Sequence, residues 1–301
     1  MASYALVTGA GGYIGGRVAQ YLARTGYIVA GIGHAGAGAL PQGIAEWVPG
    51  AVDVANLARL RQVPGLVVHC AGGSSVARSL VDPAGEEQRT LGAARAVLEY
   101  AERFAPQASL VLVSSAAVYG DVRIQPIAET QAPAPVSPYG RHKLEAEALW
   151  AAQAAQGTRA AIVRFFSVYG EGLRKQLLWD ACRKLSDGNV HFSGTGEERR
   201  DWLHVDDAAR LLAVAGEHAG ADCPIVNGAA GTAVAVREIL GELAVALQRP
   251  ADIRFDGAVR AGDPPGYWAD ISKARQWEWA PSVDWRDGVR RYANWYRTAC
   301  E

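Results

Sequence analysis

The N-terminal part of the chain reads Tyr4-Ala5-Leu6-Val7-Thr8-Gly9-Ala10-Gly11-Gly12-Tyr13-Ile14-Gly15, and this stretch decides the fold. Its first four residues predict a short buried strand, and Gly9, Gly12 and Gly15 follow at regular spacing. The amphipathic segment 17–25 predicts a helix that stops at Gly26. In a strand, glycine turn and helix, the backbone can approach a dinucleotide pyrophosphate whose charge lies at the helix N-terminus. The same residues would also form a plain strand-to-helix turn.

Apolar runs and helical patterns alternate from this turn to residue 166. Strands are predicted over residues 27–32, 66–73, 110–113 and 160–166, with a further strand end at 51–54, and a helix is predicted over 90–104. The alternation predicts an α/β fold, a Rossmann-like doubly wound parallel sheet. Beyond residue 166 the alternation weakens, and helices are predicted over 177–185, 206–214 and 236–247, with Asp206 or Asp207 as the cap of the second.

The weaker pattern predicts a second, smaller lobe. Six of the nine tryptophans lie from Trp202 to Trp295, so the composition of the tail differs from that of the N-terminal part. We expect residues 1–166 to form a dinucleotide-binding domain to which 200–222 returns. Residues 167–199 and 223–301 are expected to form a discontinuous C-terminal substrate lobe.

Composition excludes several classes of function. The formal net charge is −1, with 50% hydrophobic and 20% charged residues, so no nucleic-acid or anionic membrane surface is indicated. No apolar run has the length of a membrane span or the position of a signal peptide. The four cysteines lie far apart, so neither a metal site nor a disulfide framework is expected. A reducing cytoplasm is the expected location.

The segment Ser137-Pro138-Tyr139-Gly140-Arg141-His142-Lys143 carries the second signal. Pro138 is well tolerated just inside a helix start, so a helix is predicted from here with Tyr139 and Lys143 on one face. An ammonium beside a phenol favours the phenolate and lowers a pKa that is otherwise about 10, which suits proton transfer near neutral pH. The alternative is a tyrosine packed over a lysine stem on a surface helix.

Three positions bear on the dinucleotide. An acid at the end of the second strand would take an adenosine ribose 2′-hydroxyl, and an arginine nearby would accept a 2′-phosphate. Gly33 and His34 stand there instead, with no acid before Glu46 and no cationic side chain between that strand and Arg59. The cofactor can therefore be either NAD or NADP, and NAD is slightly preferred. Asp53 would either accept from an adenine amine or cap the following helix.

Small and hydroxyl-bearing residues end the next two strands. Cys70-Ala71-Gly72-Gly73 would let a cofactor lie close to the backbone. Ser114 and Ser115 follow the run 110–113, at the carboxyl edge where ligands bind in doubly wound sheets.

Six motifs in order resemble those of the extended short-chain dehydrogenase/reductases, in the nucleotide-sugar epimerase/dehydratase family. They span almost the whole chain and read Thr8-Gly9-x-x-Gly12-x-x-Gly15, Ser114-Ser115-x-x-x-Tyr119-Gly120, Tyr139-x-x-x-Lys143, Arg164-Phe165-Phe166-Ser167-Val168-Tyr169-Gly170, Arg200-Asp201-Trp202-Leu203-His204-Val205-Asp206-Asp207 and Arg260-x-Gly262-Asp263-Pro264.

The resemblance assigns roles. Tyr139 is implied to be the acid/base on a sugar hydroxyl, Lys143 to lower its pKa and hold the nicotinamide ribose, and Ser115 to orient the sugar oxygen. The implied cofactor contacts are Gly9, Gly12, Tyr13, Ile14, Gly15, Gly33, His34, Asp53, Val54, Cys70, Ala71, Gly72, Tyr139, Lys143 and Phe166. The implied substrate contacts are Ser115, Ala116, Phe165, Ser167, Phe192, Arg200, Arg260 and Tyr267.

Within the second set, the two arginines are implied to hold the diphosphate, for which a planar fork is suited. Phe192 is implied to lie against the nucleotide base, although a core aromatic at a strand end is equally compatible with its pattern.

Departures from the family pattern narrow the chemistry. Ala116 and Ala117 stand where the family's dehydratases carry an Asp-Glu pair, so the resemblance implies that the chain is not a dehydratase. Gly33 stands where epimerases that retain NAD place an acid. The tail 262–270 resembles that of the UDP-galactose 4-epimerase subfamily, in which the position of Tyr267 crowds the second carbon of the sugar.

The resulting hypothesis is an enzyme, a nucleotide-sugar 4-epimerase that works by reversible hydride transfer at C4 of a UDP-hexose. An NAD(P)H-dependent reductase of nucleotide 4-keto-sugars would use the same residues and is the alternative. A non-catalytic nucleotide-binding protein on the same fold is a remote alternative. A homodimer is expected, with helices 90–104 and 143–155 as its interface.

Overall fold

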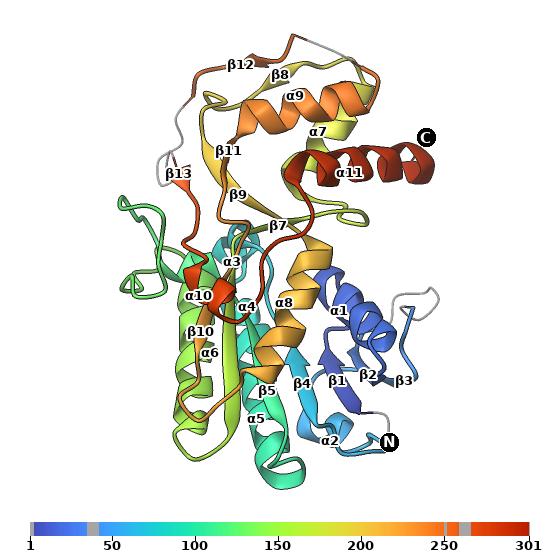
Figure 1. Cartoon of the computed structure of the whole chain (residues 1–301), viewed down its shortest axis with the longest axis vertical. Coiled ribbons are helices and arrows are strands. Elements are labelled where there is room, and N and C mark those ends of the chain that lie inside the picture. The colour runs from blue at the N-terminus through green and yellow to red at the C-terminus, as the bar shows by residue number, and fades with distance from the viewer. Residues whose placement is uncertain (1–2, 35–41, 250–251, 259–265, 301) are drawn as a thin grey trace.

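The computed structural model describes residues 3–34, 42–249, 252–258 and 266–300. Its larger part is a sheet of seven parallel strands in the order β10-β6-β5-β4-β1-β2-β3 (Figure 1). The predicted doubly wound α/β fold is confirmed. The strands are β1 (Tyr4–Thr8), β2 (Ile28–Gly33), β3 (Glu46–Pro49), β4 (Leu66–His69), β5 (Ser109–Ser115), β6 (Arg159–Phe165) and β10 (Ile225–Gly228).

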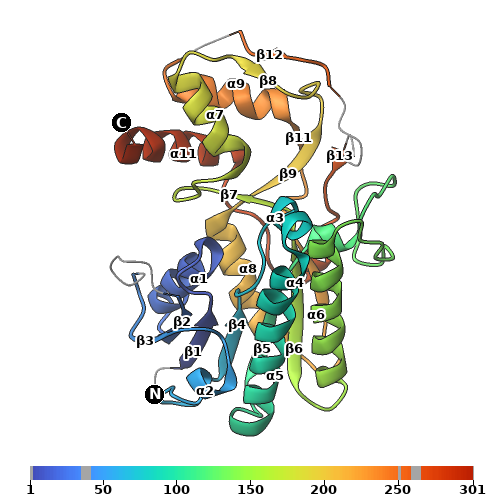
Figure 2. The ribbon, with the colours of Figure 1, turned by 180° about the vertical axis from the view of Figure 1, so that it is seen from behind.

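Helices cover both faces of this sheet. One face packs against α1 (Tyr13–Arg24) and α8 (Val205–Glu217), and the other, seen in Figure 2, against α2 (Val54–Leu57), α5 (Ala93–Phe104) and α6 (Pro138–Ala154). Alternation along β1 feeds both cores, because Ala5 and Val7 point to the first face while Tyr4 and Leu6 point to the second. Both faces are buried, as the continuous apolar runs predicted.

The helix that carries the Tyr139–Lys143 pair begins as predicted. Ser137 is the N-cap of α6, and its side chain accepts a hydrogen bond from the Gly140 N–H at 3.1 Å. Pro138 follows in the first turn, where the missing N–H leaves no bond unmade. The cap therefore fixes where Tyr139 leaves the helix.

Two predicted boundaries are corrected, and one alternative that the sequence left open is decided. The third strand ends at Pro49 rather than in 51–54, because Gly50, with φ at 131°, turns the chain away. Asp53 caps α2, its carboxylate accepting from the Asn56 N–H at 2.8 Å. Helix α8 is capped by His204 and not by Asp206 or Asp207, since the imidazole Nδ1 accepts from the Asp206 N–H at 3.3 Å.

The smaller lobe lies beyond the carboxyl edge of the large sheet (Figure 1). It contains α7 (Gln176–Ser186), α9 (Val236–Ala246) and α11 (Trp285–Cys300), which share a hydrophobic core. Its strands are β7 (Ser167–Tyr169), β8 (His191–Phe192), β9 (Arg199–His204), β11 (Ala233–Ala235), β12 (Arg254–Phe255) and β13 (Gly266–Tyr267).

The division expected at residue 223 does not hold throughout. Strand β10 pairs with β6 as the edge of the large sheet, Ile225 standing opposite Ile162. The segment around α10 (Ser272–Gln276) also packs on the core of the large sheet, through Ala274 and Trp279. The chain therefore returns twice to the larger domain after entering the smaller lobe.

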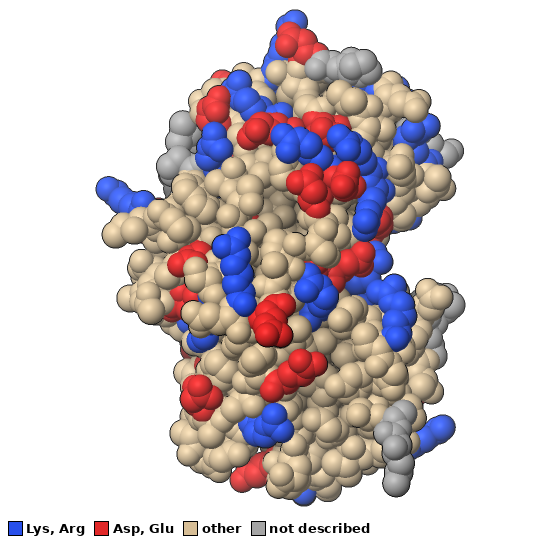
Figure 3. Space-filling view, viewed as in Figure 1, with Lys and Arg blue, Asp and Glu red and all other residues tan. Residues whose placement is uncertain are grey.

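Charges of both signs are interspersed over the face shown in Figure 3. This pattern accompanies the net charge of −1 and offers no broad field of one sign on that face. Within the described ranges, no helix is both long enough and apolar enough to span a bilayer.

Candidate active site

A cavity of about 1200 Å³ runs along the carboxyl edge of the large sheet. The glycine turn borders it, and the turn is possible only with glycine at two positions. Gly9 has φ at 66°, and a Cβ on it would come within 2.8 Å of the Ala71 nitrogen. A Cβ on Gly15 would collide with the Gly9 carbonyl oxygen, so the start of α1 packs directly on the turn. The groove thus has the bare backbone that a dinucleotide needs.

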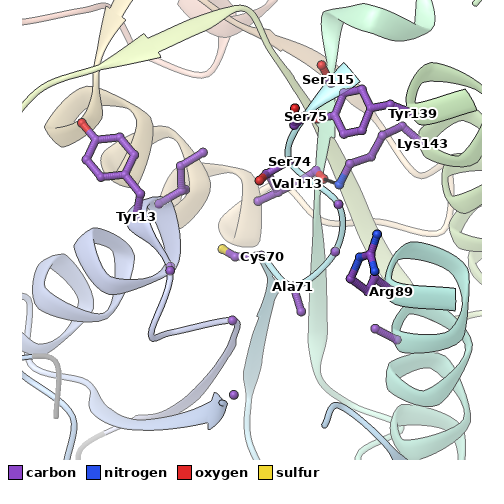
Figure 4. A pocket seen from close by; sticks show the side chains of 18 of the residues that line it. Tyr13, Cys70, Ala71, Ser74, Ser75, Arg89, Val113, Ser115, Tyr139 and Lys143 are labelled. Atoms are coloured by element: carbon purple, nitrogen blue, oxygen red, sulfur yellow. Dashed lines mark hydrogen bonds between the residues drawn. The ribbon is translucent and has the colours of Figure 1, made fainter. Parts of the chain in front are cut away.

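Most of the predicted cofactor contacts come together here. In Figure 4, Tyr13 lies on one side of the cavity, Tyr139 and Lys143 on the other, and the end of β4 between them. Val54 is the one member of the predicted set that does not line the cavity. The lining members are Gly9, Gly12, Tyr13, Ile14, Gly15, Gly33, His34, Asp53, Cys70, Ala71, Gly72, Tyr139, Lys143 and Phe166.

Ser115, Tyr139 and Lys143 converge at one end of this cavity (Figure 4). A side-chain hydrogen bond joins Ser115 to Tyr139, and the Ser115 oxygen also accepts from the Ala117 N–H at 3.2 Å. The Lys143 ammonium lies 5.9 Å from the centre of the Tyr139 ring and donates to the Val113 carbonyl at 3.0 Å. Three groups suited to proton transfer on a hydroxyl thus share one end of a cofactor-sized groove.

The pKa of Tyr139 does not follow the sequence prediction. Burial raises it above its ordinary value, and the hydrogen bond from Ser115 opposes that rise only in part. Burial likewise lowers the pKa of Lys143. The free protein therefore does not have the lowered Tyr139 pKa that the sequence predicts, because desolvation of the phenolate is the largest cause of the shift.

The predicted substrate contacts are divided between two cavities. Phe165 lines the first cavity beside Phe166, while Ser167, Phe192 and Arg200 line a second one of about 930 Å³. Gln176, at the start of α7, borders both cavities. Arg260 falls outside the described residues.

Tyr267 and Ala116 lie at the junction of the active-site end with the smaller lobe. The Tyr267 hydroxyl donates to the Ala116 carbonyl at 2.6 Å, and its ring centre lies 5.5 Å from that of Phe166. Neither residue lines the first cavity, but both pack against Phe166, which does. The contact fixes the aromatic wall of the cavity from outside.

Several lining residues were not predicted. Arg89 reaches the cavity from the π-helical turn Gln88–Gly92, and Ser75 lines it at the start of α3 (Val76–Val81). Lys175 donates to the Ser74 hydroxyl at 3.1 Å, a link between two segments that are a hundred residues apart in sequence. The only available signal was the hydroxyl pair following Gly73, because nothing in the local pattern predicts a contact made across the lobes.

Trp202 is a further unpredicted residue, in the second cavity. Its indole N–H is buried without a hydrogen-bond partner in the described part of the chain. An indole donates but does not accept, so this atom is suited to a ligand oxygen.

A buried ionic network connects the end of β5 to α6 and β6. Glu147 of α6 accepts from Arg164 at 2.6 Å and from the Ser114 hydroxyl at 2.5 Å, and both carboxylate and guanidinium are almost fully buried. The Arg164 guanidinium also lies 4.7 Å from the centre of the Tyr119 ring. The network holds the end of β5, and with it Ser115, in one position.

The opposite end of the cavity contains the residues expected near an adenosine ribose. Gly33 ends β2, and a Cβ on it would lie 3.6 Å from Trp47 and 3.8 Å from Gly9, which is ordinary contact. His34 follows and is exposed. Asp53, which caps α2, is the one carboxylate among the described lining residues. The groove accordingly has room for a ribose edge but no acid directly at the end of β2.

Comparison with known proteins agrees with this geometry. Residues 5–227 match the sequence model of the NAD dependent epimerase/dehydratase family. The UDP-glucose 4-epimerase of Azospirillum brasilense is 30% identical, over 97% of this chain and 92% of its own length. The UDP-glucuronate 4-epimerase of Thermodesulfobacterium geofontis (strain OPF15) is 26% identical, over 99% and 97%.

A solved structure is similar throughout. It is the UDP-glucose-4-epimerase from Stenotrophomonas maltophila with bound NAD and formylated UDP-arabinopyranose, which superimposes with a TM-score of 0.88 at 25% identity. The match covers 99% of this chain and 98% of the other.

Proposed function

The chain belongs to the NAD-dependent epimerase/dehydratase family, and on that basis we propose that it is a nucleotide-sugar 4-epimerase acting on a UDP-hexose. The family resemblance predicted from the motifs is confirmed. The observation that carries the proposal is the convergence of Ser115, Tyr139 and Lys143 at one end of a groove that begins at the glycine turn.

NAD is the proposed cofactor. The free backbone at Gly9, Gly12 and Gly15 fits a pyrophosphate, Asp53 lies where an adenine amine would reach it, and Lys143 lies where it would hold the nicotinamide ribose. Bound there, the nicotinamide would accept a hydride from the sugar carbon and return it. The similar enzyme from Stenotrophomonas maltophila, which binds NAD, supports this assignment.

The chain's own residues would move and position the proton. Tyr139 takes the proton of the sugar 4-hydroxyl and later returns it, and Ser115 orients that oxygen through its hydrogen bond with Tyr139. Burial raises the pKa of Tyr139 in the free protein, so the phenol must first release its own proton to solvent before Tyr139 can take one from the sugar. Lys143, held by the Val113 carbonyl, presents a fixed cation close to the tyrosine ring.

The nucleotide would occupy the second cavity. Arg200 and Trp202 offer donors to diphosphate oxygens and Phe192 an aromatic face to the base. Binding energy concentrated on the nucleotide would let the sugar turn over between the two hydride transfers. We also propose a homodimer in which α5 and α6 of each subunit meet.

A reductase of nucleotide 4-keto-sugars is the second candidate, and Gly33 is the observation that favours it. With no acid at the end of β2, the chain lacks one ordinary means of retaining NAD between turnovers. The two candidates differ in whether the cofactor leaves the protein changed. A non-catalytic role is opposed by the intact convergence of Ser115, Tyr139 and Lys143.

The decisive experiment incubates the purified protein with UDP-galactose and measures UDP-glucose formation without and with added NAD. An epimerase forms product and leaves the concentrations of NAD and NADH unchanged. A parallel incubation supplies a UDP-4-keto-sugar with NADPH or NADH. Product that forms only there, with oxidation of one cofactor molecule per product, would instead identify the reductase.

Tyr139→Phe is the matching variant. It should reduce turnover by roughly 10²- to 10⁴-fold without changing the thermal unfolding temperature, because only a proton-transfer group is lost. Tyr27→Phe, which removes a phenol outside both cavities, should retain full turnover. Normal activity in Tyr139→Phe would contradict the assignment.

A further inference from the structure

The ammonium of Lys143 lies in a place that is costly for a charge. The side chain is only 4% exposed, and within the described residues its one hydrogen bond is to the neutral Val113 carbonyl. A buried ammonium needs a counter-charge, or it loses its proton. The Asp53 carboxylate lines the other end of the cavity, so the counter-charge must come from outside the cavity wall.

Glu86 stands directly behind that wall. It belongs to the short helix α4 (Pro83–Glu87) and is 1% exposed. Thr90 donates to one of its oxygens at 2.7 Å, and the other forms a hydrogen bond with Nδ1 of His142 on α6. A carboxylate with both oxygens held in this way has a fixed position.

The Gly72–Gly73 loop and the Thr90 hydroxyl lie between this carboxylate and the lysine. A Cβ on Gly73 would collide with the carboxyl group of Glu86, whereas a Cβ on Gly72 would lie 3.5 Å from the Lys143 nitrogen and 3.4 Å from the Thr90 hydroxyl. The Gly73 N–H also donates to that hydroxyl at 2.9 Å. Two consecutive glycines therefore keep the wall thin at the point where the two charges face each other.

We propose that Glu86 is the counter-ion of Lys143, acting through the Gly72–Gly73 wall, and that Thr90 and His142 hold it in place. The inference rests on the proposed function for its importance to catalysis, but not for its test. Glu86 is thereby a positioning residue, since it touches neither cofactor nor substrate and acts through Lys143.

The other titratable groups around Lys143 have a smaller effect on its pKa than Glu86. Glu147, on the same helix, is bound by Arg164 through both oxygens. On β4 and just after it, burial lowers the pKa of His69 to about 3 and raises that of Cys70 to about 12, so both are neutral at physiological pH.

Glu86 acts on both members of the catalytic pair. Burial lowers the pKa of Lys143, and the charge of Glu86 is the largest influence that opposes this. Burial raises the pKa of Tyr139, and the charge of Glu86 adds to the rise. The charge of Glu86 thus favours the protonated form of both Lys143 and Tyr139.

The test is the titration of Lys143 in the free protein. Lys143, Lys175, Lys184 and Lys273 are the chain's four lysines, so competitive labelling with an amine-reactive reagent, read by peptide mass spectrometry across a pH series, resolves each of them. Glu86→Gln should lower the midpoint for Lys143 by about 1 pH unit or more, which is about tenfold more neutral amine at a given pH.

Glu87→Gln is the matched control, because it removes the same charge from the next residue of the same helix, where the side chain is exposed. It should leave the Lys143 midpoint unchanged, and the other three lysines should not respond to either variant. Equal Lys143 midpoints in Glu86→Gln and Glu87→Gln would overturn the proposal.

The wild-type protein supplies a second measurement should Glu86→Gln fail to fold. At about pH 7 wild-type Lys143 should label as a mainly protonated amine, and labelling as a mainly neutral amine would overturn the proposal without any variant. Because the labelling uses no sugar, its outcome is separate from that of the epimerase assay. A Lys143 shift in a protein without epimerase activity would refute the function alone, and epimerase activity without the shift would refute the counter-ion alone.

Discussion

At the scale of single residues, Gly33 is where the chain departs furthest from the means by which related folds recognise NAD. The residue ends β2 and lines the cavity, and the space beside it accepts a Cβ without crowding. A carboxylate can therefore be introduced here without disturbing the strand.

Gly33→Asp should bias the protein toward NAD. A carboxylate at this position would accept from the ribose 2′-hydroxyl of NAD and repel the 2′-phosphate of NADP, and like charges in contact cost several kcal/mol. The ratio of the Kd for NADP to that for NAD, measured by calorimetry on the free protein, should rise at least about tenfold. Gly33→Asn, of equal size and no charge, should leave the ratio near that of wild type, and a rise in both variants would exclude the electrostatic explanation.

Sequence reasoning predicted residues that line one cavity, but it did not predict the direction of their pKa shifts. A spacing of four places Tyr139 and Lys143 on one helix face, and the glycine pattern places the turn. Neither pattern predicts how deeply Tyr139 and Lys143 are buried, and burial decides the direction of both pKa shifts. Glu86 gave no signal in sequence, because it comes close to Lys143 only when α4 packs against α6 beside the Gly72–Gly73 loop.

At the scale of elements, local signals predicted what local contacts determine. Pro138 and the Ser137 cap placed the start of α6 correctly, since both act within one turn. The cap of α8 was wrong because two acids near a helix start are the usual signal, and here tertiary contacts hold one of them. Asp207 instead accepts from the Ser282 and Val283 N–H groups at 3.0 and 2.9 Å.

The His204 cap joins an arrangement that ties β7, β9 and α1 together. With Nδ1 accepting from the Asp206 N–H, Nε2 is the donor to Glu171, at 2.9 Å. Arg17 of α1 donates to the Glu171 carbonyl at 3.1 Å. Burial alone would raise the pKa of Glu171, but the hydrogen bond from His204 and the nearby charges outweigh it and hold the pKa at about 2.

This arrangement should make stability depend on pH in a defined window. A carboxyl whose pKa falls from 4.5 to about 2 on folding stabilises the protein above pH 4.5, and that contribution is lost as pH falls toward 2. Urea unfolding at about pH 7, 5 and 4 should show Glu171→Gln less stable than wild type at neutral pH, with the gap narrowing below pH 4.5. The exposed variant Glu217→Gln should show no such gap, and a gap for Glu171→Gln that is constant with pH would contradict the linkage.

At the scale of the whole molecule, the chain passes between the two lobes more often than the sequence pattern predicted. Strand β10 has only four residues, and its partner β6 lies some sixty residues earlier in the chain, so its place in the large sheet follows from pairing rather than from periodicity. That return leaves β9 with Arg200 beside the second cavity while α8 covers the large sheet. One continuous segment, β9 followed by α8, thus contributes residues to the second cavity and a covering helix to the large sheet.

The proposed binding of cofactor in the first cavity and nucleotide in the second predicts separate effects on the KM for the substrate and the Kd for the cofactor. Arg199 and Arg200 are consecutive in β9 and point to opposite faces, and only Arg200 lines the second cavity. Arg200→Gln should raise the KM for UDP-galactose roughly ten- to a hundredfold, the range of one charge-assisted hydrogen bond, while the Kd for NAD stays unchanged. Arg199→Gln removes the same charge from the opposite face of β9 and should leave the KM for UDP-galactose within about twofold of wild type. Equal effects of the two variants on KM would show that the nucleotide of the substrate does not lie across β9. An unchanged Kd for NAD in Arg200→Gln is the control that the substitution leaves the fold intact, because Arg200 lies outside the cofactor groove.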